Sequence, residues 1–274
     1  MDKVHYELMR PQEIVSARDR MPVVYVPIGP MEWHGPHLPL GVDMLHAHAM
    51  AVAAVRKTGG VVLPPLPLGT ETYTDPERLR HRGFTGHERI HGMDYPGFSV
   101  PSLYIEESAC GVVIREVILG LKRQGFRVIA MVNGHGATNH RAMLSRLAVE
   151  ESEPGNVAVL LTGYFYDTRY REHAALGETS CLLAVHPDTV DLSALPAPQV
   201  ALDYREFGIL DRATIVGEPT PGFVVCADED PRRATAAQGR ADVDRESDSI
   251  AQRVRVALAS IDRDHGTPAE SPHH

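Results

Sequence analysis

Short apolar runs alternate with amphipathic patterns along most of the chain. Near-continuous apolar runs predict buried strands, at residues 22–29, 61–63, 126–132 and 156–164. Apolar positions at helical spacing predict helices, at residues 43–57, 106–124, 141–150 and 247–261. Because the strands lack a clean two-residue alternation and are separated by helices, the pattern predicts an α/β fold with a parallel sheet covered on both faces.

Two stretches lack this alternation of apolar runs and amphipathic patterns. Residues 71–101 are rich in Arg, His, Gly and Pro and show no sustained period, which is typical of a functional loop or an excursion from the fold. Residues 201–230 are similarly irregular. No linker divides the chain, so we expect one domain over residues 1–264, followed by a disordered tail at 265–274.

Charge and composition narrow the class of protein. The 274 residues include 27 Lys and Arg against 36 Asp and Glu, and the net charge of −9 argues against a general affinity for nucleic acid or anionic membranes. No apolar run approaches the roughly 18 residues of a membrane span, and the first twenty residues lack the apolar core of a secretory signal. The odd number of cysteines favours a reducing, cytoplasmic location, with each thiol a small buried side chain rather than a nucleophile: Cys110, Cys181 and Cys226.

Candidate metal ligands follow two of the predicted strands. Glu32 and His34 come shortly after the strand at 22–29, and residues two apart in an extended segment point to the same side. Asp43 follows at the start of a predicted helix, after a loop shaped by proline and glycine. His135 comes directly after the strand at 126–132, and the glycines on both sides of it allow close approach of the backbone.

A third cluster places Glu178 at the start of a predicted helix, shortly after His173. Together the clusters supply imidazole and carboxylate groups, a mixed set that suits Zn²⁺, Mn²⁺ or Fe²⁺. Two such ions about 3.5–4 Å apart, bridged by one carboxylate, would activate a water and polarise a carbonyl group. Each motif alone has a simpler interpretation, and for Asp43 that interpretation is a helix N-cap. Their combination at successive strand ends favours a metal site.

The same motifs resemble those of a known family. The segment EWHGPHLPLGVD resembles the signature E-Q-H-G-P-H-L-P-L-G-T-D of the creatininase (creatinine amidohydrolase) family. NGHG and HAALGETS resemble the blocks N-G-H-G-G-N and H-A-G-x-x-E-T-S of that family, in the same order, so the resemblance spans residues 22–190. It implies a three-layer α/β/α sandwich with a metal site at the carboxyl edge of the sheet, and a homo-oligomer, plausibly a hexamer.

The resemblance also implies roles for the ligands. Glu32 and His135 would bind one ion and His34 the other, with Asp43 bridging the two. His173 falls where the family has a catalytic histidine. Glu178 falls on the glutamate of the third block, where it would act as a ligand or as a neighbour of the ligands.

The chain departs from creatininase proper at two positions. Creatininase has a glutamate ligand of the second metal where this chain has Ala137, so either Glu178 replaces it or the second site is weak or empty. Creatininase also holds its flat substrate between tryptophans further along the chain, whereas Trp33 is the only tryptophan here. Creatinine is therefore not the expected substrate.

Several further residues near these motifs have two interpretations. His37 is either a neighbour of the ligands or part of the loop structure. His46, one turn after Asp43 on the predicted helix, either approaches the site or, like His48, lies in the core or on the surface, and the second interpretation is favoured. The stretch at 71–101 is either a solvated loop or oligomer contact, or a lid that binds a polar or anionic substrate through arginine. Its charged and histidine residues are Arg78, Arg80, His81, Arg82, His87, Arg89 and His91. Three tyrosines are expected to line the pocket: Tyr164, Tyr166 and Tyr170.

These features predict a metal-dependent amidohydrolase with one or two ions per chain, Zn²⁺ first and Mn²⁺ or Fe²⁺ next. A water activated by the metal would attack the carbonyl carbon of a small cyclic or related amide, and His173 would protonate the nitrogen that leaves as the C–N bond breaks. One alternative is ring opening of a cyclic polyol ketone or lactone at the same site. Another is a non-catalytic metal-binding homologue, which Ala137 favours.

Overall fold

A four-stranded parallel sheet forms the centre of the molecule. The computed structural model describes residues 3–92, 94–96, 98, 100–163, 173–205, 208–210 and 228–265. Its strands lie in the order β2 (Val61–Val62), β1 (Val23–Ile28), β3 (Val128–Asn133) and β4 (Ala158–Gly163), and every neighbouring pair is parallel. All residues of β1 and β3 are buried, which is why these strands appear in the sequence as continuous apolar runs.

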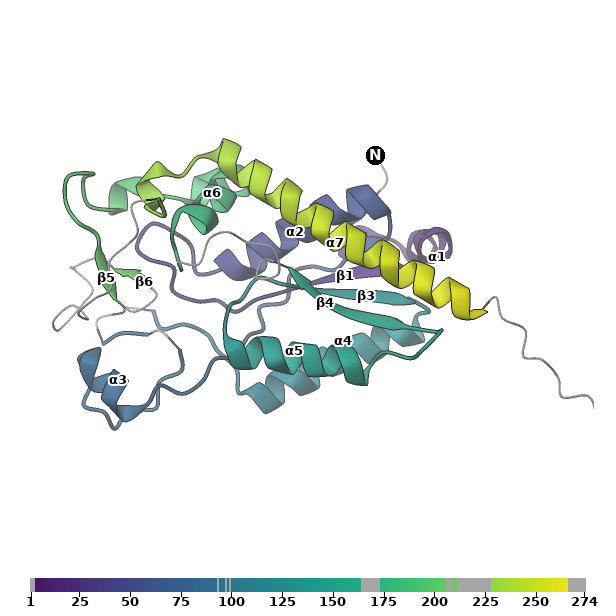
Figure 1. The fold of residues 1–274 in the computed structure, drawn as a ribbon, viewed down its shortest axis with the longest axis horizontal. Coiled ribbons are helices and arrows are strands. Elements are labelled where there is room, and N and C mark those ends of the chain that lie inside the picture. Colours follow the sequence, from purple (N-terminus) through teal and green to yellow (C-terminus); the bar gives the residue numbers. More distant parts are fainter. Residues whose placement is uncertain are drawn as a thin grey trace, which may run out of the picture.

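Helices cover both faces of this sheet (Figure 1). On one face lie α2 (Val42–Thr58), α6 (Leu176–Val185) and α7 (Ala236–His265), and on the other lie α4 (Glu107–Arg123) and α5 (Thr138–Glu150). Successive residues of β1 and β3 join opposite cores, because side chains alternate between the two faces of a strand. The predicted three-layer α/β/α sandwich is confirmed.

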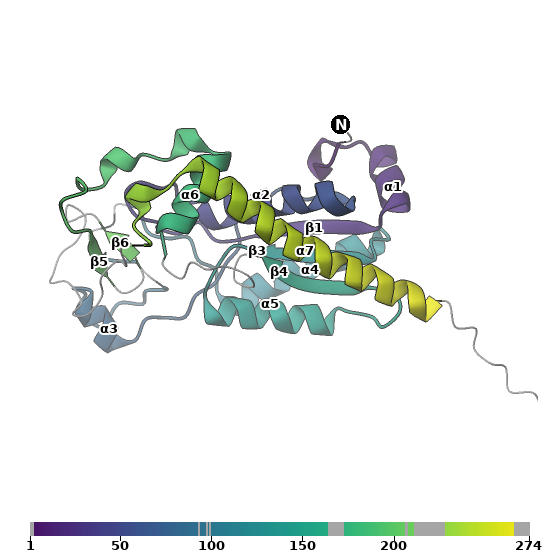
Figure 2. The same ribbon diagram turned by 45° about the horizontal axis from the view of Figure 1, so that its top comes forward.

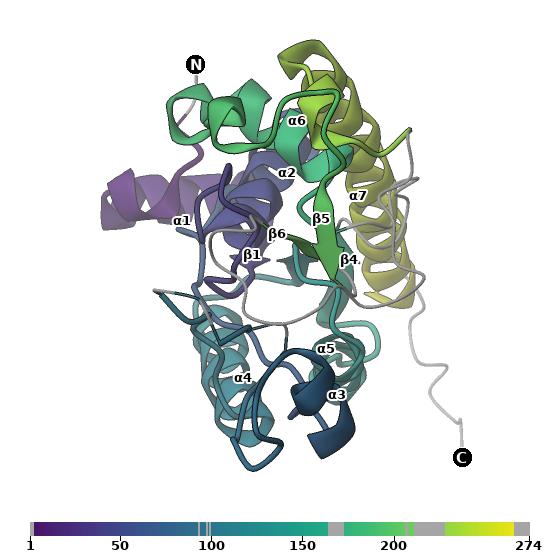
Figure 3. The ribbon, with the colours of Figure 1, turned by 90° about the vertical axis from the view of Figure 1, so that its left-hand side faces the viewer.

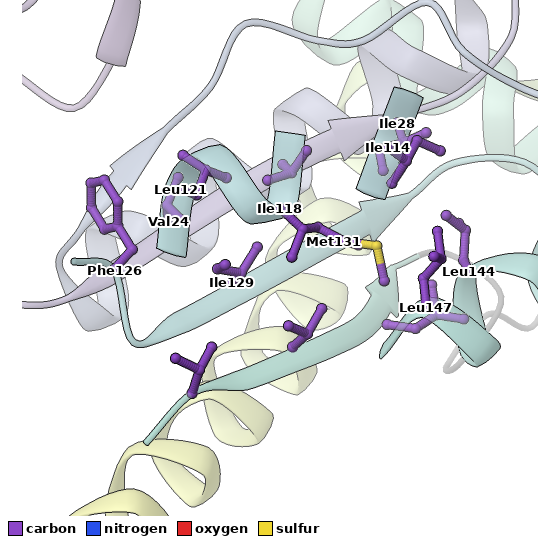
Figure 4. Close-up of a cluster of buried hydrophobic side chains, with 14 of the residues drawn as sticks. Val24, Ile28, Ile114, Ile118, Leu121, Phe126, Ile129, Met131, Leu144 and Leu147 are labelled. Atoms are coloured by element: carbon purple, nitrogen blue, oxygen red, sulfur yellow. The ribbon is translucent and has the colours of Figure 1, made fainter. Parts of the chain in front are cut away.

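Helix α4 shows how periodicity in the sequence becomes packing. Ile114, Ile118 and Leu121 follow one another at helical spacing and are buried against the sheet, where Val24 and Met131 meet them (Figure 4). Burying each side chain of this size contributes roughly 1.5–3 kcal/mol.

Two predicted helices begin earlier than expected. Helix α5 begins at Thr138 instead of residue 141, and α7 begins at Ala236 instead of 247 and continues to His265. The first turns of α7 carry few apolar residues, so the apolar pattern did not indicate them. The helix packs there through a glycine instead: a Cβ on Gly239 would lie 1.8 Å from the carbonyl oxygen of Ser180. Helix α7 lies against α2, α6 and β4 (Figure 2).

The irregular stretches contain elements that the apolar pattern did not predict. Helix α3 (Pro76–His81) lies within the first stretch and is capped by the Asp75 side chain, and the second contains the antiparallel pair β5 (Asp203–Arg205) and β6 (Gly208–Leu210). Both elements lie at the end of the molecule toward which the sheet strands run (Figure 3). The remaining elements are α1 (Pro11–Arg20) and the short 3₁₀ helices η1 (Tyr6–Leu8), η3 (Pro187–Thr189), η4 (Leu192–Ala194) and η6 (Pro231–Arg233).

The structure tests two further expectations, one about the cysteines and one about membrane-spanning helices. Cys110 and Cys181 are buried free thiols, as predicted, whereas Cys226 and residues 266–274 lie outside the described part. Within the described residues, no helix has the length and apolar character needed to cross a bilayer.

Candidate metal centre

Asp43 lies between two histidines, and each of its carboxylate oxygens faces a different one. Its Oδ2 lies 3.0 Å from Nδ1 of His135, and its Oδ1 lies 3.1 Å from Nε2 of His34. Glu32 Oε2 approaches His135 Nδ1 at 3.1 Å, and Glu178 Oε2 approaches His34 Nε2 at 3.7 Å. The structure therefore brings together all five side chains that the sequence proposed as ligands.

These side chains form two groups with one shared member. The first triad is Glu32, Asp43 and His135, and the second triad is His34, Asp43 and Glu178. Within each triad one donor atom from every residue lies within 4.8 Å of the others. None of the five residues is more than 4% exposed, so solvent cannot replace the partners of these polar atoms.

The segment after β1 carries two of the ligands. The Glu32 backbone N–H donates to the carbonyl of Leu40 at 2.8 Å, which closes the loop that leads to α2. His34 Nδ1 lies 3.0 Å from the Glu32 carbonyl oxygen. A carbonyl oxygen only accepts hydrogen bonds, so this contact places the proton of a neutral His34 on Nδ1. Nε2, which faces Asp43, then has a lone pair with which it could bind a metal ion.

Close packing sets the position of Asp43. The residue is the second of α2, where Gly41 is the N-cap and no side chain caps the helix, so the N-cap interpretation of Asp43 is wrong. A Cβ on Gly29 would lie 2.6 Å from the Asp43 Cβ, and a Cβ on Gly134 would lie 2.0 Å from the Asp43 carbonyl oxygen. Glycine at both positions lets the first turn of α2 lie directly on the ends of β1 and β3.

Local hydrogen bonds hold the other two ligands. The Asn133 side chain accepts from the His135 backbone N–H at 3.0 Å and donates to the His135 carbonyl at 2.7 Å, which fixes the turn after β3. Glu178 lies in the first turn of α6, and its Oε2 accepts from the backbone N–H of Ala174 at 2.6 Å. Ala174 has φ of +56°, a conformation that non-glycine residues rarely adopt.

Burial and charge act in opposite directions on these groups. Burial raises the pKa of Glu178, but the neighbouring His34 outweighs it and lowers that pKa to about 2. Burial lowers the pKa of His135, but Glu32 and Asp43 outweigh it and raise that pKa to about 10. The same balance holds the pKa of Asp43 below its usual range and that of His34 well above it. In the absence of metal, protons on the imidazoles compensate the buried carboxylates.

The donor set fits a pair of divalent metal ions. Asp43 Oδ2 and His34 Nε2 are buried and have no hydrogen-bond partner among the described residues, although each faces groups of the opposite charge. Mixed imidazole and carboxylate donors are the ligands that Zn²⁺, Mn²⁺ and Fe²⁺ prefer.

His173 lies beside this centre. One of its nitrogens falls within 4.8 Å of donor atoms of Glu32 and His34, and its ring centroid lies 4.0 Å from that of His34. Its Nε2 lies 2.6 Å from the Trp33 carbonyl oxygen, to which it donates. The three tyrosines expected to line the pocket lie outside the described residues.

His37, His46 and Ala137 belong to neither triad. His37 is buried, its Nε2 lies 3.0 Å from the Thr179 hydroxyl, and burial lowers its pKa to about 4. His46 is paired with Glu246 in the core between α2 and α7, as the core interpretation predicted. Ala137 is the N-cap of α5 and offers no side-chain donor to the centre.

The arginines of the 71–101 stretch differ in their surroundings. Arg82 is buried within the stretch, where it donates to the Gly92 carbonyl and lies over the Tyr95 ring. Arg89 lies over the Tyr73 ring and pairs with Glu106. Arg78 and Arg80 are exposed.

The residue that the sequence did not indicate is Tyr104. Its hydroxyl donates to Glu32 Oε1 at 2.6 Å, across 72 positions of the chain. Burial and the charge of Glu32 raise the pKa of this phenol well above 10, so it acts as a donor. Tyr104 lies in a short segment without metal-ligand spacing, so no local pattern connected it to Glu32.

Comparisons with known proteins agree on the family. The family model described as creatinine amidohydrolase matches residues 7–254. A mycofactocin precursor peptide peptidase of Mycolicibacterium smegmatis is 29% identical over 230 residues, which cover 80% of this chain and 78% of the relative. A creatinine amidohydrolase of Pseudomonas putida is 24% identical over 191 residues, or 62% of this chain and 66% of the relative. A 3-dehydro-scyllo-inosose hydrolase of Thermotoga maritima is 28% identical over 133 residues, or 48% of this chain and 36% of the relative.

Solved structures show the same fold. A crystal structure of creatininase superposes with a TM-score of 0.61 at 21% identity, and the match covers 93% of this chain and 97% of that chain. The family model spans nearly all of the residues that build the sheet, its covering helices and both triads. The chain therefore belongs to the creatinine amidohydrolase (creatininase) family of metal-dependent hydrolases.

Proposed function

We propose that this chain hydrolyses the C–N bond of an amide at a pair of divalent metal ions. The first triad would hold one ion and the second triad the other. The observation that carries the proposal is the placement of Asp43, whose two oxygens face His34 and His135 separately. Manganese and zinc–zinc forms of creatininase are among the structural neighbours, which supports the same metals here.

Glu178 is proposed as the ligand that completes the second site. Ala137 lacks a donor, whereas Glu178 is buried and lies 3.7 Å from His34. The N–H of Ala174 binds the same Glu178 oxygen and thereby fixes its direction. The second site of this chain is then built from α6 instead of from the loop after β3.

The chain supplies orientation and proton transfer around this centre. Divalent ions held in such a pair lower the pKa of water and polarise a substrate carbonyl. His173 is proposed to protonate the leaving nitrogen, because it lies beside Glu32 and His34 and its imidazole can donate a proton. Its contact with the Trp33 carbonyl places a proton on Nε2 and orients the ring.

The proposed substrate is a small cyclic or related amide other than creatinine. Creatinine is disfavoured because the chain has no tryptophan beyond Trp33. The similarity to a mycofactocin precursor peptide peptidase over most of both chains supports peptide amides among the related substrates.

Ring opening of a cyclic polyol ketone is a second candidate. The similarity to 3-dehydro-scyllo-inosose hydrolase favours it, although that match covers about a third of the relative's length. Both candidates use the same metal pair, so the substrate distinguishes them.

A substrate panel tests the proposal. The protein loaded with Zn²⁺ or Mn²⁺ would be assayed with creatinine, other cyclic amides, short peptides and a keto-inositol. We expect turnover of a cyclic amide or a peptide, its loss with a chelator, and its loss in His173→Gln without a change in metal content. Turnover of the keto-inositol alone would replace the proposal by the second candidate. Turnover that survives both metal removal and His173→Gln would refute the mechanism.

A further inference from the structure

The segment that carries Glu32 is held by a second segment that directly follows the irregular stretch. The N–H of Leu103 donates to the Met31 carbonyl at 2.7 Å in an antiparallel bridge. The N–H of Trp33 donates to the Ser102 hydroxyl at 3.0 Å. We call residues 102–104 the clasp. They bind the backbone on both sides of Glu32, outside the central sheet.

Tyr104 extends the clasp to the Glu32 side chain. Its hydroxyl donates to Oε1 at 2.6 Å, while the other oxygen, Oε2, lies 3.1 Å from His135 Nδ1. The two oxygens of Glu32 therefore have separate partners. One is occupied by a phenol, and the other faces the first triad.

The Tyr104 ring has a backbone neighbour that restricts it. A Cβ on Gly92 would lie 2.7 Å from the Tyr104 hydroxyl oxygen and 2.8 Å from its Cε2. Gly92 has φ of +57°, a conformation that suits glycine, and its N–H donates to the Thr72 carbonyl at 3.0 Å. The irregular stretch thus keeps the phenol directed at Glu32.

We propose that Tyr104 is a positioning residue that makes Glu32 a one-oxygen ligand of the ion held with His135. The inference rests on the proposed function, because it assumes an ion at the first triad. Removing the hydroxyl would leave Oε1 buried without its donor and would free the carboxylate to rotate. Loss of a partner that orients a metal ligand typically weakens metal binding by about 10–100-fold.

The chain offers a matched control at Tyr73. Its hydroxyl also donates to a glutamate, Glu106; Tyr73 lies within the irregular stretch and Glu106 follows it. Glu106 is an exposed surface side chain that belongs to neither triad. Tyr73→Phe therefore removes the same chemical group without touching the metal centre.

Cobalt titration isolates the effect on one ion. The Glu178→Gln background removes a ligand of the second triad and leaves the first triad intact. In that background we would measure Co²⁺ affinity by competition with a chelator, with the visible absorption of bound Co²⁺ as the signature of its geometry. We expect Tyr104→Phe to weaken Co²⁺ binding by about 10–100-fold and to change the absorption, and Tyr73→Phe to leave both within twofold.

The outcomes separate the inference from the function on which it rests. Unchanged Co²⁺ affinity and absorption in Tyr104→Phe would overturn the positioning role. An equal effect in Tyr73→Phe, or a matching loss of stability in the metal-free Tyr104→Phe protein, would also overturn it, because the effect would then be a general disturbance of the stretch. If the unsubstituted chain binds no Co²⁺, the proposed function fails first.

Discussion

Gly134 has no space for a side chain because the backbone of Asp43 lies against it. A Cβ at Gly134 would come within 2.0 Å of the Asp43 carbonyl oxygen, closer than any real contact. Gly134 immediately precedes His135, so this contact joins the helix that carries the shared carboxylate to the turn that carries a histidine of the first triad. The distance between two proposed ligands is set by backbone packing.

Gly134→Ala should therefore separate Asp43 from His135. Overpacking of this kind typically costs about 1–3 kcal/mol of stability, and here the shift would also weaken metal binding. Gly120→Ala is the control, because a Cβ at Gly120 on α4 would meet only the tip of Arg123 at 3.7 Å. Urea unfolding and metal content would be measured for both. Equal behaviour of the two variants would contradict the packing argument.

Asp43→Asn should remove both ions, since one carboxylate faces both histidines. The loss of affinity should exceed the roughly 100-fold limit typical of residues that only orient a ligand. Asp244→Asn is the control, because Asp244 is an exposed residue of α7 that forms an ion pair with Lys57 of α2. Retention of two tightly bound ions by Asp43→Asn would exclude a bridging role.

Ala174→Gly should be tolerated better than Ala175→Gly. Both side chains are fully buried, so each substitution loses one buried methyl group and adds the freedom of glycine to the unfolded chain. Only Ala174 has a left-handed conformation, which costs a residue with a Cβ about 1–2 kcal/mol, whereas Ala175 has φ of −97°. The free energy of unfolding of Ala174→Gly should therefore exceed that of Ala175→Gly by about 1–2 kcal/mol. Chemical unfolding of both variants tests this, and equal destabilisation would show that Ala174 is not strained.

The buried pair of His46 and Glu246 should make stability depend on pH. Burial opposes protonation of His46, but Cys181 and Glu246 outweigh it and raise its pKa well above 6.5. A group with a raised folded-state pKa stabilises fully below its unfolded pKa of about 6.5, and this stabilisation is lost as pH rises toward the folded value. The free energy of unfolding of the native protein relative to His46→Gln, with chelator present, should therefore be larger at pH 6 than at pH 9. A difference that does not change with pH would contradict this assignment.

The sequence predicts those parts of the fold that pack through apolar side chains. β1 and α4 match their predicted ranges closely because every residue of β1 is buried and α4 buries one periodic face. The beginning of α7 was missed because its close contact is made by Gly239, which carries no apolar signal.

The proposed ligands are recognisable from the sequence because each follows a strand or begins a helix in a short motif. The partner of Glu32 is different. Tyr104 meets it across 72 positions through a clasp that lies outside the sheet, and only tertiary structure brings them together. The proximity of Glu178 to His34, 3.7 Å between Oε2 and Nε2, also arises only in the folded chain, and it supports the proposal that Glu178 completes the second site.

The metal content of the purified chain and of Glu178→Gln tests the two-metal centre most directly. Elemental analysis should find two divalent ions per native chain and one per Glu178→Gln chain, because the variant loses a ligand of the second triad only. One ion in the native chain, unchanged by Glu178→Gln, would contradict the two-metal centre.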